Sequence, residues 1–112
     1  MGSDRAGPPT FSVDVTTDDG WTTVAVAGEL DLATADELSD AVRTGLASGA
    51  VRLDLRDVTF MDSAGVRALN TALRESAARG RELQVSDGLQ PAVLQLLEMT
   101  GMLGLLPMED GR

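Results

Sequence analysis

The sequence predicts a single α/β domain, in which an antiparallel hairpin is followed by alternating helices and strands. The chain has 112 residues, of which 43% are hydrophobic, and this content suffices for one modest core. Two segments with a strand-like apolar alternation flank an Asp-Gly pair, which is a hairpin signal. Segments with a helical repeat then alternate with strand-like ones, and strands joined through a helix run parallel. We therefore expect a mixed sheet with helices packed on it.

The hairpin is predicted from alternation on both sides of the turn. Phe11, Val13 and Val15 alternate with polar residues in FSVDVTT, as a strand with one buried face requires, and WTTVAVAGEL continues after Asp19-Gly20. Residues 1–10, MGSDRAGPPT, carry two glycines and two prolines and little apolar content. They are expected to form a flexible leader.

The first helix is predicted to begin at a capping box. Thr34 and Glu37 have the three-residue spacing of that motif, and Gly49 is expected to end the helix. The apolar residues that recur every four positions along one face are Leu38, Val42 and Leu46.

The second half of the chain repeats this order. VRLDLRDV (51–58) predicts a strand, RELQVSD (81–87) another, and QPAVLQLLEMTG (90–101) a helix with Pro91 in its first turn. A helix ending near Gly80 lies between the two strands, and its predicted core face comprises Val66, Leu69, Leu73 and Ala77. The domain is expected to span 11–107, with a short tail at 108–112. The sheet face without helices is either open or covered by the hairpin.

The composition excludes several classes of function. The chain has no cysteine and no histidine, and its nine basic residues are all arginines, which removes thiolate and imidazole ligands and the usual general bases. We expect no enzyme activity and no cofactor or metal. The net charge of −9 disfavours nucleic acid and anionic lipid as partners, although solubility alone also explains it. With no apolar stretch of about 20 residues and no signal peptide, we expect a cytoplasmic protein without membrane insertion.

The stretch VTFMDSAGVRAL (58–69) places Asp62 and Ser63 between a strand and a helix. The structural explanation is that one of them caps the helix, because both residue types accept amide hydrogens of a first turn. Loops at the carboxyl ends of strands in α/β sheets also bind ligands and partners. Ala64 and Gly65 would then let another backbone approach the hydroxyl.

Ser63 suits a phosphate acceptor better than a catalytic nucleophile. A nucleophilic serine needs a base such as histidine or lysine, which this chain lacks. An acceptor needs only exposure in a loop that a kinase can reach. The phosphate adds a charge of about −1.5 to −2, which an interface would have to desolvate.

Three segments together resemble a known family. GELDLATADEL (28–38), VRLDLRDVTFMDSAGVRAL (51–69) and AVLQLLEMTGM (92–102) are similar, in order and spacing, to the anti-sigma factor antagonists of bacteria, which are built on the STAS domain. The resemblance covers Phe11 to about Pro107 and implies a STAS-like fold.

The resemblance also implies partner switching. The unphosphorylated antagonist would bind an anti-sigma factor serine kinase, a histidine-kinase-like ATPase that carries the ATP, and so release a sigma factor. Phosphorylation of Ser63 would end binding, and a PP2C-type phosphatase would restore it. The expected partner-binding residues are Asp31, Asp62, Ser63, Ala64, Gly65 and Val66.

Plainer roles remain open for some of these residues. Asp31 can simply start the first helix, Glu29 can be a solvated strand end, and Val66 can belong to the core. Relatives often carry a second serine where this chain has Ala64, and commonly continue into another helix after its last residues. Either the domain is naturally short, or a sheet left bare there would favour self-association as a homodimer. An alternative function is a STAS subunit of a lipid-trafficking ABC transporter.

Overall fold

A computed structural model of the chain describes residues 11–109. The predicted leader, residues 1–10, and residues 110–112 of the predicted tail lie outside the described residues. The elements are β1 (Phe11–Asp18), β2 (Trp21–Leu30), α1 (Ala35–Ser48), β3 (Ala50–Met61), α2 (Ser63–Arg79), β4 (Leu83–Val85), α3 (Pro91–Met99) and the 3-10 helix η2 (Leu103–Leu105).

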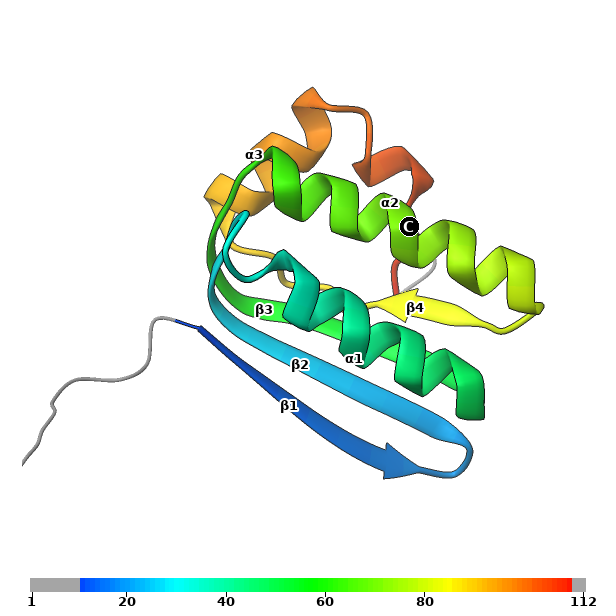
Figure 1. Cartoon of the computed structure of the whole chain (residues 1–112). Coiled ribbons are helices and arrows are strands. Elements are labelled where there is room, and N and C mark those ends of the chain that lie inside the picture. Colours follow the sequence, from blue (N-terminus) through cyan, green and yellow to red (C-terminus); the bar gives the residue numbers. More distant parts are fainter. Residues whose placement is uncertain (1–10, 110–112) are drawn as a thin grey trace, which may run out of the picture.

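The predicted α/β architecture is confirmed. The four strands lie in the order β1-β2-β3-β4, with β1 antiparallel to β2 and the other pairs parallel. Asp19 and Gly20 both adopt positive φ, of 51° and 82°, which suits the tight hairpin turn between the first two strands. Figure 1 shows α1 and α2 side by side over one face of the sheet, with α3 and η2 beyond α2. None of the helices within residues 11–109 is long and apolar enough to cross a bilayer.

The core lies between this face and the helices. The alternation in β2 and β3 directs every second side chain toward α1, whose predicted apolar face is buried. The fully buried side chains of these three elements include Val24, Val26, Leu38, Leu46, Leu53 and Leu55.

Two bulges carry β3 beyond its predicted end at residue 58. Residues 25–27 of β2 face residues 54–57 of β3, and residues 28–29 face residues 58–60, so β3 twice contains one extra residue. The spacing of its buried positions accordingly changes from two to three, at Val58 and Met61. The second half of the strand therefore does not follow the strict apolar–polar alternation from which its first half was predicted.

The predicted core face of α2 is partly wrong. Leu69 is buried, and Val66 and Leu73 pack half-buried against the core, but Ala77 is exposed. The face turned inward consists mainly of small residues: Ala64, Gly65, Ala68, Ala72 and Ser76. Small side chains let α2 approach α1 and the sheet closely.

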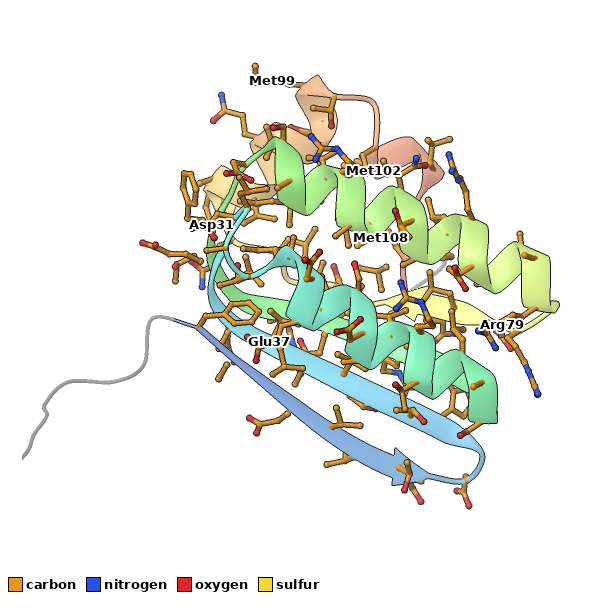
Figure 2. All side chains as sticks on the ribbon, in the orientation of Figure 1. Asp31, Glu37, Arg79, Met99, Met102 and Met108 are labelled. Atoms are coloured by element: carbon orange, nitrogen blue, oxygen red, sulfur yellow. The ribbon has the colours of Figure 1, made fainter. Side chains whose placement is uncertain are left out.

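The prediction of a capping box at the start of α1 is also wrong, although Gly49 ends the helix as predicted. Thr34 is the N-cap residue, but its side chain makes no capping hydrogen bond. Its hydroxyl instead accepts from the Asp31 amide at 2.9 Å and donates to the Glu29 carbonyl at 2.8 Å. Glu37 stays exposed, and Figure 2 shows it at the first turns of α1.

The carboxyl-terminal part of the sheet is rearranged relative to the prediction. β4 has three residues instead of the seven predicted, and α3 begins at Pro91 as expected. The Val85 amide donates to the Pro107 carbonyl at 2.9 Å, and the Glu109 amide donates to the Val85 carbonyl at 2.7 Å. Residues 107–109 therefore continue the sheet beside β4, past the predicted end of the domain.

The sheet face turned away from α1 and α2 is polar. It is partly accessible, because the hairpin of β1 and β2 lies within the sheet and does not cover this face. The Arg52 guanidinium lies 4.8 Å from the ring centroid of Trp21. Arg56 pairs with Asp54 at 2.9 Å, and this hydrogen bond holds the pKa of Asp54 below its ordinary 3.8, against the opposing effect of partial burial.

The first turn of α2 is docked tightly on the ends of β2 and β3 through Gly65. A Cβ at Gly65 would lie 2.5 Å from Met61 Cγ and 3.1 Å from both Leu30 Cγ and the Leu30 carbonyl oxygen. The backbone oxygen cannot move aside without disturbing the strand. Glycine is thus required here by packing.

Gly65→Ala should destabilise the domain by roughly 1 to 3 kcal/mol, as expected for overpacking, although alanine ordinarily favours a helix. Urea unfolding followed by circular dichroism measures the change. Gly104→Ala is the matched control, because a Cβ there meets nothing within 4 Å, and it should alter stability by less than about 0.5 kcal/mol. Equal stability of Gly65→Ala and the parent chain would contradict this packing.

Candidate functional site

The candidate site lies where β2 and β3 end and α2 begins. Leu30 and Met61 are the last paired residues of the two parallel strands, so Asp31 and Asp62 emerge side by side. The Asp62 amide donates to the Leu30 carbonyl at 3.3 Å. Figure 2 shows Asp31 beside the start of α2. Residues 31 apart in the sequence thus share one edge of the sheet.

Asp62 caps α2, and this leaves Ser63 free of that task. The Asp62 Oδ1 accepts from the amides of Ala64 at 2.9 Å and Gly65 at 3.4 Å. Ser63 is the first helical residue and its side chain is exposed. The capping role expected of one of these two residues is therefore filled by Asp62. The Ser63 hydroxyl is accessible to an enzyme.

Asp31 organises the loop before α1 and does not start the helix itself. Its Oδ1 accepts from the Ala33 amide at 3.0 Å, and its backbone carbonyl accepts from the Ala35 amide at 2.8 Å. The side chain is half-buried, whereas Glu29 is exposed at the strand end. Asp31 therefore combines a local structural role with a position on the surface beside Asp62.

The expected partner-binding residues differ in accessibility. Asp31, Asp62 and Val66 are half-buried and Ser63 is exposed, but Ala64 and Gly65 are buried. Packing, and not access for a partner, therefore explains the glycine, because a Cβ at residue 65 would lie 3.1 Å from the Leu30 carbonyl oxygen. Contact of any of the six with a partner remains a prediction.

Two exposed apolar side chains beside these polar residues were not predicted. Leu32 is 77% exposed in the loop after Asp31, and Phe60 is 47% exposed two residues before Asp62. Large apolar side chains next to a polar motif are typical of protein contact sites. Their adjacency to the two aspartates in the sequence was the available signal. We call Asp31, Leu32, Phe60, Asp62 and Ser63 the strand-end surface.

A groove between α1 and α2 opens beside this surface. It is lined by Leu32, Ala35, Asp36, Ser39, Ala64, Arg67, Ala68 and Thr71. Arg67, the basic residue of this set, was not singled out from the sequence. It follows Ser63 by one helical turn.

The chemistry available here is that of an accessible alcohol. The Asp62 carboxylate is engaged in the helix cap. Within residues 11–109, no three side chains among aspartate, glutamate, histidine and cysteine are grouped to hold a metal ion. The arrangement suits recognition and modification by another protein.

Comparison with known proteins places this site in a family context. A family model described as "Mlab, STAS domain" matches residues 13–107. The anti-sigma-B factor antagonist of Listeria monocytogenes is 33% identical over 92 residues, covering 78% of this chain and 77% of that protein. The anti-sigma-B factor antagonist of Staphylococcus aureus is 28% identical over 103 residues, covering 90% and 94%.

Solved structures agree with this relationship. An anti-sigma factor antagonist from Mycobacterium paratuberculosis superposes with a TM-score of 0.77 at 27% identity, covering 93% of this chain and 89% of that one. The unphosphorylated form of SpoIIAA, at 18% identity, shares the fold with a TM-score of 0.71 and 87% coverage of each chain. The chain belongs to the STAS-domain family of anti-sigma factor antagonists.

Proposed function

We propose that this chain is a partner-switching antagonist: unphosphorylated, it binds an anti-sigma factor serine kinase and so releases a sigma factor. The observation that carries the proposal is the exposed Ser63 hydroxyl beside an aspartate that caps the helix alone. Two curated relatives are named as antagonists of an anti-sigma factor. On this proposal the chain is a binding module of the cytoplasm, where sigma factors act, and not an enzyme.

The kinase supplies ATP and the catalytic groups. The Ser63 Oγ attacks the γ-phosphorus, the bond from that phosphorus to the ADP oxygen breaks, and the serine proton leaves to a base of the kinase. A PP2C-type phosphatase hydrolyses the phosphate ester and regenerates the alcohol. This chain contributes only the acceptor and the surface that the kinase recognises.

Charge explains why phosphorylation would end binding. A phosphate on Ser63 places a charge of about −1.5 to −2 next to Asp62 and close to Asp31. An interface that covers this spot must desolvate the added charge, with a penalty of about 2 to 5 kcal/mol if it stays unpaired. The fold itself tolerates the group, because Ser63 is exposed and the cap belongs to Asp62.

Leu32 and Phe60 are suited to anchor the partner. They are exposed on the strand-end surface and flank the polar residues. Binding energy in protein interfaces concentrates in a few such apolar and aromatic side chains. The aspartates around them favour a partner with basic residues opposite.

A second function is a STAS subunit of a lipid-trafficking ABC transporter, using the same surface without a phosphate cycle. The Mlab description of the matching family model favours it. Copurification of the chain with a transporter ATPase, and not with a serine kinase, would replace the first proposal with this one.

Incubation with the candidate kinase and ATP should add a single phosphate, which Ser63→Ala abolishes because the acceptor oxygen is lost. Intact-protein mass spectrometry detects the added mass. Ser48→Ala, at the far end of α1, removes another exposed serine and should leave phosphorylation unchanged. A phosphate that persists in Ser63→Ala would refute the assignment.

Ser63→Asp should weaken binding to the candidate anti-sigma factor by a factor between tens and thousands, because a carboxylate replaces a neutral group in the interface. Isothermal titration calorimetry measures the affinity, and the melting temperature should stay unchanged. Ser48→Asp is the matched control and should bind like the parent chain. Unweakened binding by Ser63→Asp would exclude Ser63 from the interface.

Phe60→Ala and Leu32→Ala should each weaken the same complex by roughly tenfold or more, as expected for truncated anchors. Val15→Ala provides the comparison, because Val15 is also an exposed apolar residue, 53% accessible, but lies on edge strand β1. Surface plasmon resonance should show faster dissociation only for the first two variants. Parent-like dissociation in both would remove them from the contact.

A further inference from the structure

We propose that Arg67 is the cation of this chain that binds the phosphate of phosphorylated Ser63. The inference rests on the proposed function, because it concerns the modified state of Ser63. Arg67 is exposed on α2, four residues after Ser63, and it lines the groove beside the strand-end surface. No other residue on that groove is basic.

Helix geometry brings the two side chains together. Residues four apart on a helix have Cβ atoms roughly 5 to 6 Å from each other, and an anion preceding a cation is the more favourable order. Helical side chains also lean toward the amino terminus, so an arginine at position i+4 extends back over residue i. Its guanidinium fork matches phosphate oxygens in shape and charge.

The phosphate needs such a cation because its other surroundings are unfavourable. Asp62 already accepts the amides of Ala64 and Gly65, so these donors are not available to the new group. The acidic side chains around it are Asp62 itself, Glu29 at the end of β2, Asp31 in the loop after β2, and Asp36 from α1 across the groove. Each of them disfavours the doubly charged phosphate.

Arg67 has no competing ion pair among residues 11–109. The arginines in ion pairs within 4.0 Å there are Arg43, Arg52, Arg56 and Arg79. Arg67 can therefore turn to the phosphate without breaking a salt bridge of the described structure. Binding of the phosphate by Arg67 would hold it against α2 and add to the stability of the phosphorylated chain.

The test uses homogeneous phosphoprotein, made by incorporating phosphoserine at position 63 during translation, so that no kinase is needed. Phosphorus NMR between pH 4 and 8 gives the second pKa of the phosphate, about 6 in an isolated phosphoserine. Arg67→Gln should raise this pKa by roughly half a unit relative to the parent phosphoprotein, because a nearby cation favours the dianion. The difference should shrink at 1 M salt, where charges are screened beyond about 3 Å.

Arg74→Gln is the matched control. Arg74 is exposed on α2, but it lies eleven residues after Ser63, about 16 Å along the helix axis. This variant should leave the phosphate pKa unchanged. Circular dichroism verifies that both variants fold.

Melting temperatures give a second readout. If the pKa of the phosphate is lower in the folded state than in the unfolded state, the interaction stabilises the fold fully at pH values above the unfolded-state pKa. This stabilisation is lost as the pH falls through the folded-state pKa. The phosphorylated Arg67→Gln variant should therefore melt below the phosphorylated parent at pH 7.5, and the gap should narrow at pH 5. The unphosphorylated pair should show no such pH-dependent gap.

Equal phosphate pKa values in the parent and Arg67→Gln would overturn the assignment of Arg67, whether or not a kinase acts on Ser63. Failure of the kinase to modify Ser63 would instead refute the proposed function and leave the NMR result intact. The two failures are thus distinguishable.

Discussion

The strand-end surface depends on the contact between Gly65 of α2 and Leu30 of β2. The Leu30 carbonyl lies where a Cβ of residue 65 would come within 3.1 Å of it, and it also accepts the Asp62 amide. One backbone group therefore joins the last residue of β2 to both the cap and the first turn of α2. This fixes Ser63 at the mouth of the helix and Asp31 next to it. The surface is held by the backbone, and its side chains remain available to a partner.

A division of labour between Asp62 and Ser63 follows from this arrangement. The aspartate satisfies the helix amides and the serine does not, so modification of the serine leaves the helix start intact. A switch that used its own cap as the acceptor would lose helix stability each time it was modified. On the proposed function, separation of the two roles would let binding change while the fold stays constant. Arg67 adds a cation on the same face, one turn further along.

Much of the fold was predictable because its periodicities are local. The alternation of Val24 and Val26, and the four-residue repeat of Leu38, Val42 and Leu46, depend only on which face each element buries. The misses have tertiary causes. The end of β3 was hidden by bulges, and the face of α2 was misassigned because close helix packing selects small residues.

The capping box failed for a related reason. The Thr34 hydroxyl bonds to backbone groups of the preceding loop, at Asp31 and Glu29, and a spacing pattern does not reveal such a choice.

The polar part of the site was predictable and the apolar part was not. Asp31, Asp62 and Ser63 were expected together because the family resemblance implies that they share one contact surface, and the structure brings the two aspartates side by side. Leu32 and Phe60 were missed because an isolated apolar residue in a sequence is ordinarily assigned to the core. Only the structure shows that these two side chains are exposed. Arg67 was missed because its relevance depends on which face of α2 is free. The residues that were missed are those whose importance depends on their exposure, and exposure depends on the whole fold.

The position of Trp21 has a practical consequence for experiments on this protein. It is the single tryptophan of the chain, it is the first residue of β2, and its ring contacts the Arg52 guanidinium. Ser63 lies at the opposite end of the sheet, past the last residue of β2. Ten residues of strand place the two ends roughly 30 Å apart. Intrinsic fluorescence will therefore report on the integrity of the sheet and remain largely blind to events at Ser63. It offers a spectroscopic signal of unfolding for comparing the modified and unmodified chain.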